Sequence, residues 1–175
     1  MWVDFFSRVL DMTDVVTELA ARLGTGLKAA GQTVATAESC TGGGIAEALT
    51  RIAGSSVWFD RGWVTYSNKA KQQELGVSAN VLRAQGAVSE VVVLAMAEAA
   101  RQQAATDWAV AVSGIAGPDG GSAEKPVGTV WLAWVGPQGE IAEHHVFPGD
   151  REEVRRQTVL RALSGLLEQM GLASS

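Results

Sequence analysis

The sequence predicts an α/β fold of three layers, in which helices cover both faces of a mixed, mostly parallel β-sheet. Two observations point to this class. Strand-like and helix-like segments alternate along most of the chain, which is typical of parallel strands joined by helical crossovers. Nearer the C-terminal end, segments 127–135 and 140–147 flank Pro137-Gln138-Gly139, a pattern that predicts an antiparallel hairpin.

The spacing of apolar residues assigns the individual elements. Helices are expected, in chain order, at 13–30, from 42, at 69–75, from 78, at 89–103 and from 150 to about 171. Strands are expected at 33–37, 56–66 and 108–112, ahead of the hairpin. Gly31 ends the first helix, and Asp150 is expected to cap the last one.

Composition narrows the functional classes. The chain has 175 residues, of which 47% are hydrophobic, so we expect one domain over residues 1–175. A formal net charge of −5 without a basic stripe disfavours nucleic acid as a partner. The single cysteine excludes an internal disulfide, and no metal or cofactor is expected. Without a membrane-length apolar run or a basic leader, the protein is expected to be cytoplasmic.

A turn rich in hydroxyls and glycines follows the first predicted strand. It reads Ala37-Glu38-Ser39-Cys40-Thr41-Gly42-Gly43-Gly44 and leads into a helix. A helix N-terminus offers free backbone N–H groups and the positive end of its dipole. Glycine also lets a ligand approach the backbone closely. We therefore expect a nucleophile and an anion site to share this turn.

Two further loops at strand ends contain residues suited to ligand binding or catalysis. Residues 113–122, Ser-Gly-Ile-Ala-Gly-Pro-Asp-Gly-Gly-Ser, follow the strand that has the most buried composition. Residues 64–71, Val-Thr-Tyr-Ser-Asn-Lys-Ala-Lys, place a phenol and two lysines after the extended segment. Open α/β sheets bind ligands beyond the carboxyl ends of their strands, so the loops are expected to face one crevice.

Four segments of the chain carry a family likeness: Thr36–Gly43, Ile52–Ser56 with Val64–Asn68, Gly86–Ser89, and Ser113–Gly121 continuing to Lys125–Val130. With them the chain resembles the CinA C-terminal domain family from about residue 13 to residue 170. The resemblance implies that family's fold and hydrolysis of the carboxamide of nicotinamide mononucleotide. The products are nicotinate mononucleotide and ammonia, in pyridine nucleotide salvage.

The resemblance also implies a metal-free serine mechanism. On this sequence the nucleophile is Ser39, assisted by Tyr66 and Lys71. Lys71 is preferred to Lys69 and Lys125 because it follows the Tyr-Ser-Asn run, and it is expected within direct or water-bridged reach of Ser39. The residues expected to bind the nucleotide are Glu38, Thr41, Gly42, Gly43, Ser113, Gly114, Gly117, Gly120 and Gly121.

Such a lysine must be neutral to accept a proton. Its ordinary pKa of about 10.4 has to fall to about 7–8 for it to act as a base near neutral pH. Burial lowers a lysine pKa, and so does a nearby positive charge. The pyridinium ring of the substrate carries such a charge, so substrate binding is expected to lower the pKa of this lysine further.

Several residues have more than one interpretation. Cys40 is intrinsically a better nucleophile than Ser39. A cysteine hydrolase usually needs a histidine partner, however, and both histidines, His144 and His145, lie far from the glycine-rich loops in sequence. A packing role is therefore favoured for Cys40. Glu38 either fixes the turn or contacts substrate. Three arginines open the last helix as a solvated face or as a phosphate or subunit contact: Arg151, Arg155 and Arg156.

The function itself has an alternative. A non-catalytic nucleotide-binding or interaction module of the same fold would also keep the glycine-rich loops. The intact trio of Ser39, Tyr66 and Lys71 favours the hydrolase. The hydrophobic composition and tryptophan-rich hairpin favour a homo-oligomer, a dimer first of all.

Overall fold

The computed structural model describes the backbone of residues 2–173 and the side chains from residue 15 to residue 173. Its helices are α1 (Trp2–Ala30), α2 (Gly44–Thr50), α3 (Asn68–Leu75), α4 (Ala79–Gln85), α5 (Glu90–Ala104) and α6 (Arg151–Gln169). Its strands are β1 (Val34–Glu38), β2 (Phe59–Val64), β3 (Trp108–Gly114), β4 (Thr129–Gly136) and β5 (Gly139–Val146). A short 3₁₀ turn, η1 (Ser55–Val57), precedes β2.

The strands form one mixed sheet with the order β2-β1-β3-β4-β5. Strand β1 lies in the centre of a parallel group, because it pairs in parallel with both β2 and β3. Strand β4 pairs antiparallel with both β3 and β5, which confirms the predicted hairpin. The mixed sheet is therefore confirmed, and in the described part of the chain parallel and antiparallel pairings are equal in number.

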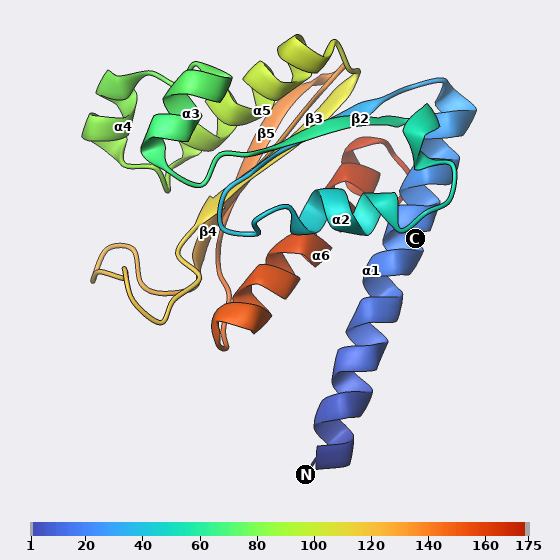
Figure 1. The fold of residues 1–175 in the computed structure, drawn as a ribbon, viewed down its shortest axis with the longest axis horizontal. Coiled ribbons are helices and arrows are strands. Elements are labelled where there is room, and N and C mark those ends of the chain that lie inside the picture. The colour runs from blue at the N-terminus through green and yellow to red at the C-terminus, as the bar shows by residue number, and fades with distance from the viewer. Residues whose placement is uncertain (1, 174–175) are drawn as a thin grey trace.

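Helices cover both faces of the sheet, as predicted for three layers. Helices α1, α2 and α6 lie on one face, and α3, α4 and α5 lie on the other (Figure 1). Strand β3 serves both cores because its side chains alternate. Val110 and Val112 join the core with α1, α2 and α6, whereas Ala109 and Ala111 join the core with α5. This central strand is thus buried on both faces.

Two elements differ from their predicted bounds. Helix α1 begins at Trp2, well before residue 13, and residues 2–12 contain no glycine or proline to stop it. The segment expected to be extended from residue 56 begins instead with η1, and β2 starts at Phe59. The left-handed conformation of Gly54 precedes this turn and redirects the chain.

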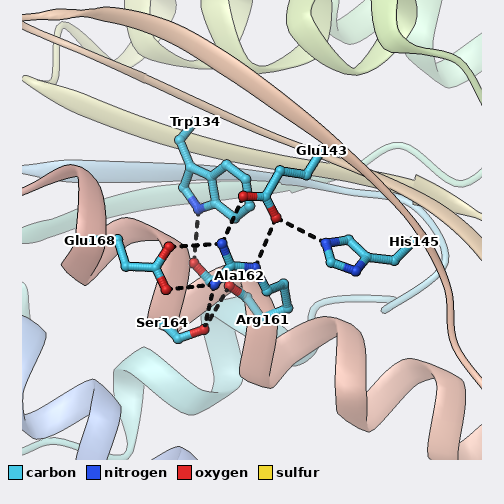
Figure 2. A network of polar contacts seen from close by, with 7 residues as sticks. All are labelled: Trp134, Glu143, His145, Arg161, Ala162, Ser164 and Glu168. Carbon is cyan, nitrogen blue, oxygen red and sulfur yellow. Dashed lines mark hydrogen bonds and ion pairs between the residues drawn. The ribbon is translucent and has the colours of Figure 1, made fainter. Parts of the chain in front are cut away.

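Helix α6 is held firmly at its start and in its middle. Asp150 and Glu153 form a reciprocal capping box. Further along, Arg161 lies between two carboxylates, with Nη2 2.7 Å from Glu143 of β5 and Nη1 2.7 Å from Glu168 (Figure 2). The first turns of α6 lie beside the loops that follow β1 and β3, because Arg155 donates to Thr41 O at 3.0 Å and Arg151 donates to Gly117 O at 2.9 Å. No helix among residues 2–173 combines the length and apolar character needed to cross a membrane.

Candidate active site

The loops that follow β1, β2 and β3 meet at the carboxyl ends of these parallel strands, as predicted. They enclose a cavity of about 280 Å³, to which α6 also contributes. Ligand sites at this edge of a sheet are usual in α/β folds. The residues that line the cavity are Ser39, Cys40, Tyr66, Asn68, Lys71, Ala87, Val88, Ser113, Gly114, Ile115, Ala116, Gly117, Asp119, Gly120 and Arg151.

Ser39 and Lys71 are in direct contact in this cavity. The Nζ atom of Lys71 lies 2.9 Å from Ser39 Oγ and 2.7 Å from the carbonyl oxygen of Thr65. Ser39 follows β1, whereas Lys71 comes from α3, which is capped by the Ser67 side chain. Both side chains are buried. The strand-to-helix turn and the capped helix thus bring a hydroxyl and an amine within one hydrogen bond.

The environment of Lys71 suits a base. Burial lowers the pKa of Lys71 from 10.5 to about 8, because the protein interior disfavours the ammonium form. With such a pKa, roughly a tenth of the Lys71 side chains are neutral at pH 7. A neutral Lys71 accepts the hydrogen bond of the Ser39 hydroxyl and so raises its nucleophilicity.

The other lysines considered from the sequence lie elsewhere. Lys125 donates to the carbonyl oxygen of Gln85 at 2.9 Å and does not line the cavity. Lys69 is exposed on α3. Of the three candidates, Lys71 is therefore the one placed against Ser39.

Cys40 is next to Ser39 but has the opposite electrostatic character. Burial raises the pKa of its thiol to about 12, so the thiolate is absent near neutral pH. Its sulfur also packs against Gly114, where an added Cβ would lie only 3.1 Å from Sγ. These observations support a packing role for Cys40.

Glu38 fixes the turn that carries Ser39. Its side chain is fully buried and accepts hydrogen bonds from Thr41 Oγ1 at 2.6 Å, Ile45 N at 2.8 Å and Ala46 N at 3.0 Å. Of the two interpretations of Glu38, the geometry supports the structural one. The carboxylate thus occupies two of the free N–H groups expected at the start of α2, those of Ile45 and Ala46.

Two other N–H groups in this turn lie directly after Ser39. Among the described residues, the backbone N–H groups of Cys40 and Thr41 donate to no backbone carbonyl, and the Cys40 N–H is in contact with its own thiol. The Gly42 and Gly44 N–H groups bond to carbonyls of the turn itself. Donors directly after a nucleophilic serine are suited to stabilise an oxyanion. The expectation of an anion site in this turn therefore narrows to the N–H groups beside Ser39.

The residues expected to bind the nucleotide divide into two groups. Ser113, Gly114, Gly117 and Gly120 line the cavity, and Ser113 Oγ donates to the carbonyl oxygen of Ala87 at 2.8 Å. The others lie outside its lining: Glu38, Thr41, Gly42, Gly43 and Gly121. Positive φ angles at Gly42 and Gly43 allow the chain to turn sharply after Ser39.

Arg151 lines the cavity, whereas the sequence left it open between a solvated helix face and a phosphate or subunit contact. Its guanidinium donates to the hydroxyl of Tyr66 at 2.7 Å and to the carbonyl oxygen of Gly117 at 2.9 Å. Tyr66 is 58% exposed at the cavity wall, so the pair stands where a ligand enters. The cluster of arginines in the first turns of α6 indicated a possible phosphate contact in the sequence. Which of these side chains points into the cavity depends on how α6 packs against the sheet.

The two histidines lie away from the cavity. His145 contacts Glu143 and stacks on Phe147, and His144 lies against Trp131, all away from the cavity lining. Among the residues described, no group of three or more His, Cys, Asp and Glu side chains could hold a metal ion.

Comparison with known proteins places the chain in a family. The family model described as the CinA C-terminal domain matches residues 16–170. The nicotinamide-nucleotide amidohydrolase PncC of Pseudomonas putida is 57% identical over 155 residues, covering 89% of this chain and 97% of that protein. The protein of the same name from Escherichia coli K12 is 56% identical over 160 residues, covering 90% and 97%.

Solved structures agree with this relationship. The competence damage-inducible protein A of Klebsiella pneumoniae matches with a TM-score of 0.86 and 41% identity, over 89% of this chain and 97% of that one. The competence/damage inducible protein of Agrobacterium tumefaciens matches with a TM-score of 0.84 and 49% identity, over 90% and 96%. The chain belongs to the CinA C-terminal domain family.

Proposed function

We propose that this protein is an amidohydrolase that converts nicotinamide mononucleotide into nicotinate mononucleotide and ammonia, a step of pyridine nucleotide salvage. The observation that carries the proposal is the buried contact of 2.9 Å between Lys71 Nζ and Ser39 Oγ at a cavity wall. The high identity to proteins named nicotinamide-nucleotide amidohydrolase supports the same reaction and substrate.

The first chemical step forms an acyl-enzyme. Neutral Lys71 takes the proton of the Ser39 hydroxyl while Ser39 Oγ attacks the carboxamide carbon. The resulting oxyanion accepts hydrogen bonds from the N–H groups of Cys40 and Thr41. The C–N bond then breaks, and the Lys71 ammonium returns its proton to the departing nitrogen, which leaves as ammonia.

The second step regenerates the enzyme. Lys71 is neutral again and takes a proton from water, and the resulting hydroxide attacks the acyl carbon. The bond to Ser39 Oγ breaks, Ser39 recovers its proton from Lys71, and nicotinate mononucleotide is released. Ser39 and Lys71 supply both the nucleophile and the base, so the mechanism requires no metal.

Tyr66 and Arg151 act at the outer end of the substrate. The phenol oxygen accepts from Arg151, which leaves the Tyr66 O–H free to donate toward the cavity. The Arg151 guanidinium provides the positive charge that the substrate phosphate requires. Tyr66 thus assists the serine by orienting the nucleotide, and the cavity glycines allow the ring to lie close to the backbone.

The test is an assay with nicotinamide mononucleotide that measures ammonia and nicotinate mononucleotide together. We expect equimolar products, full activity after EDTA treatment, and no products from Ser39→Ala, which should still bind the nucleotide. Binding without ammonia release by the wild-type protein would instead indicate the non-catalytic module. Loss of activity in EDTA, restored by a divalent ion, would contradict the metal-free mechanism.

A further inference from the structure

Helix α6 contacts the turn at residues 39–43, which carries Ser39 and lies between β1 and α2. The helix packs beside α2 (Figure 1), and Arg155 extends from it to this turn. Arg155 Nη2 donates to the carbonyl oxygen of Thr41 at 3.0 Å, a contact between residues 114 positions apart in the chain. A Cβ added at Gly42 would lie 3.6 Å from the same nitrogen. The guanidinium therefore lies directly against the turn that bears the candidate nucleophile.

Thr41 is fixed at its side chain and at its carbonyl group. Its Oγ1 donates to the Glu38 carboxylate at 2.6 Å. Its carbonyl oxygen accepts from Arg155 and, at 3.2 Å, from the Gly44 N–H. The residue is also buried. Because the peptide units are planar and Thr41 is held at these atoms, the direction of its own backbone N–H is fixed as well.

Arg155 also brings a positive charge to this turn. Burial raises the pKa of Cys40 to about 12, and the charge of Arg155 acts against this rise. The field of the guanidinium thus reaches the residue directly after Ser39, where it favours any neighbouring anion. Arg155 does not line the cavity that holds Ser39 and Lys71. It can therefore influence the reaction only through the turn.

We propose that Arg155 is a positioning residue for amide hydrolysis and acts through Thr41. It holds the Thr41 carbonyl group so that the N–H of Thr41 keeps its direction toward the oxyanion that forms on the carboxamide. Its charge also offsets the partial negative charge of the carbonyl oxygen, which opposes an oxyanion nearby. This role rests on the proposed function, because the oxyanion belongs to that reaction.

The three arginines at the start of α6 have different environments, which provides a matched control. Arg151 lines the cavity, whereas Arg155 donates to the turn. Arg156 follows Arg155 directly, and its Nη2 lies 3.1 Å from Glu152 Oε1. Arg156→Met therefore removes the same kind of side chain from the same part of the helix without removing the contact with Thr41.

Steady-state kinetics with nicotinamide mononucleotide give the first test. Arg155→Met keeps an apolar stem but removes the charge and the donors, and we expect kcat to fall about tenfold to a hundredfold. Loss of an oxyanion donor itself costs roughly 10²–10³-fold, and a misdirected donor costs less. KM should change by less than about twofold, because the contact matters in the transition state. Arg155→Lys, which keeps the charge, should recover part of kcat, and Arg156→Met should retain the wild-type kcat.

A second readout measures the reactivity of Ser39 without the nucleotide. p-Nitrophenyl acetate acylates an activated serine and releases p-nitrophenolate, whose absorbance gives the rate and the amplitude of a burst. We expect the burst rate of Arg155→Met to fall by a factor similar to that of kcat, with an unchanged amplitude per chain. A role of Arg155 in folding alone would instead lower the amplitude and leave the rate of the folded chains unchanged.

The proposal is overturned if folded Arg155→Met keeps the wild-type kcat and burst rate, if KM changes in place of kcat, or if Arg155→Lys is no more active than Arg155→Met. Equal impairment of Arg156→Met would overturn it as well. If circular dichroism shows that Arg155→Met does not fold, Arg155→Lys decides, since it should keep the burst amplitude and react more slowly than the wild type. A wild-type burst rate in Arg155→Lys would then refute the role.

These measurements separate this proposal from the proposed function. A wild-type protein that shows the burst but releases no ammonia from nicotinamide mononucleotide would contradict the proposed function, and the burst rates would still test Arg155. A wild-type protein with neither activity would contradict Ser39 as the nucleophile and Arg155 as its positioning residue together. Ammonia release that is equal in the wild type and in folded Arg155→Met would contradict only the role of Arg155.

Discussion

Burial affects the two residues beside Ser39 in opposite ways. It lowers the pKa of Lys71 to about 8, which brings the neutral amine within reach of neutral pH. It raises the pKa of Cys40 to about 12, which keeps the thiol protonated and unreactive. In both cases the interior penalises the charged form. The same desolvation therefore favours the weaker nucleophile, Ser39, because only Ser39 has a base in contact.

Substitution at Ser39 and at Cys40 should separate these roles. Ser39→Ala removes the attacking oxygen, and we expect kcat to fall by roughly 10³-fold or more with little effect on folding. Cys40→Ala removes a packed thiol, so we expect nearly normal kcat and a loss of about 1 kcal/mol in the free energy of unfolding. Steady-state kinetics and denaturant unfolding measure both. An active Ser39→Ala beside a folded but inactive Cys40→Ala would reverse the assignment.

The pH dependence of activity should report Lys71. With Lys71 as the proposed base, kcat/KM should rise with pH through an apparent pKa of about 8 in the free enzyme. The bound substrate is cationic and disfavours the ammonium form, so the pKa read from kcat should be lower. Lys71→Arg keeps a charge without a neutral amine and should be nearly inactive.

The activity of Lys71→Arg decides whether Lys71 acts as a proton acceptor or only as a positive charge. If Lys71→Arg retained most activity with an unchanged pH profile, Lys71 would hold charge and not transfer protons. Tyr66→Phe would then be the variant to examine, since the Tyr66 hydroxyl also lies at the cavity wall and could transfer a proton.

At the scale of an element, α2 depends on the strand before it. The helix has only seven residues, and its N-cap, Gly43, supplies no side-chain hydrogen bond. A helix this short is marginal unless its ends are satisfied. Glu38 supplies the missing acceptors from the end of β1. One carboxylate thus joins the strand, the turn that bears Ser39 and the helix.

Replacing this carboxylate should damage both stability and catalysis. Glu38→Gln keeps the shape but turns an N–H₂ group toward backbone donors, so we expect a loss of about 1–3 kcal/mol in the free energy of unfolding. Displacement of Ser39 should lower kcat more than it changes KM. Glu47→Gln is the control, because Glu47 lies in the first turn of the same helix but is largely exposed. It should change stability by less than about 0.5 kcal/mol.

An unchanged Glu38→Gln protein would show that the turn holds its shape without the charge. In that case the hydrogen bonds that Ser39 N donates to Val112 and that Ser39 O accepts from Gly42 would have to be sufficient to place the nucleophile.

The sequence predicts most elements because their signals are local. Gly31 indicates the C-terminal end of α1, Asp150 indicates the start of α6, and the turn at Pro137-Gln138-Gly139 indicates the hairpin. The occupant of the α2 N-terminus could not be predicted in this way. The glycine-rich turn indicates that donors are present there, but which acceptor takes them depends on the direction of the Glu38 side chain in the folded core.

At the scale of the whole molecule, the site is built by topology. Parallel pairing of β1 with β2 and β3 brings three strand ends together, and this convergence follows from the alternation of strands and helices in the sequence. The balance of parallel and antiparallel strands and the position of Arg151 do not follow from it. They depend on where β4, β5 and α6 pack, and these contacts join residues that are far apart in the sequence.

The packing of α6 against the sheet should make stability depend on acidic pH. Arg161 holds the pKa of Glu143 at about 2, below its ordinary value of 4.5. A carboxylate with a lowered folded pKa stabilises the native state above pH 4.5, and this contribution is lost as the pH falls toward 2.

Because both groups are partly exposed, we expect Arg161→Met to lower the free energy of unfolding by about 1–2 kcal/mol at pH 7. Denaturant unfolding of both proteins from pH 7 to pH 3 should show the difference shrinking below pH 4.5. Glu168→Gln, which removes the more exposed partner of Arg161, should cost less at every pH. A difference between wild type and Arg161→Met that stayed constant over this range would mean that Arg161 acts by packing on Trp134 and not by its charge.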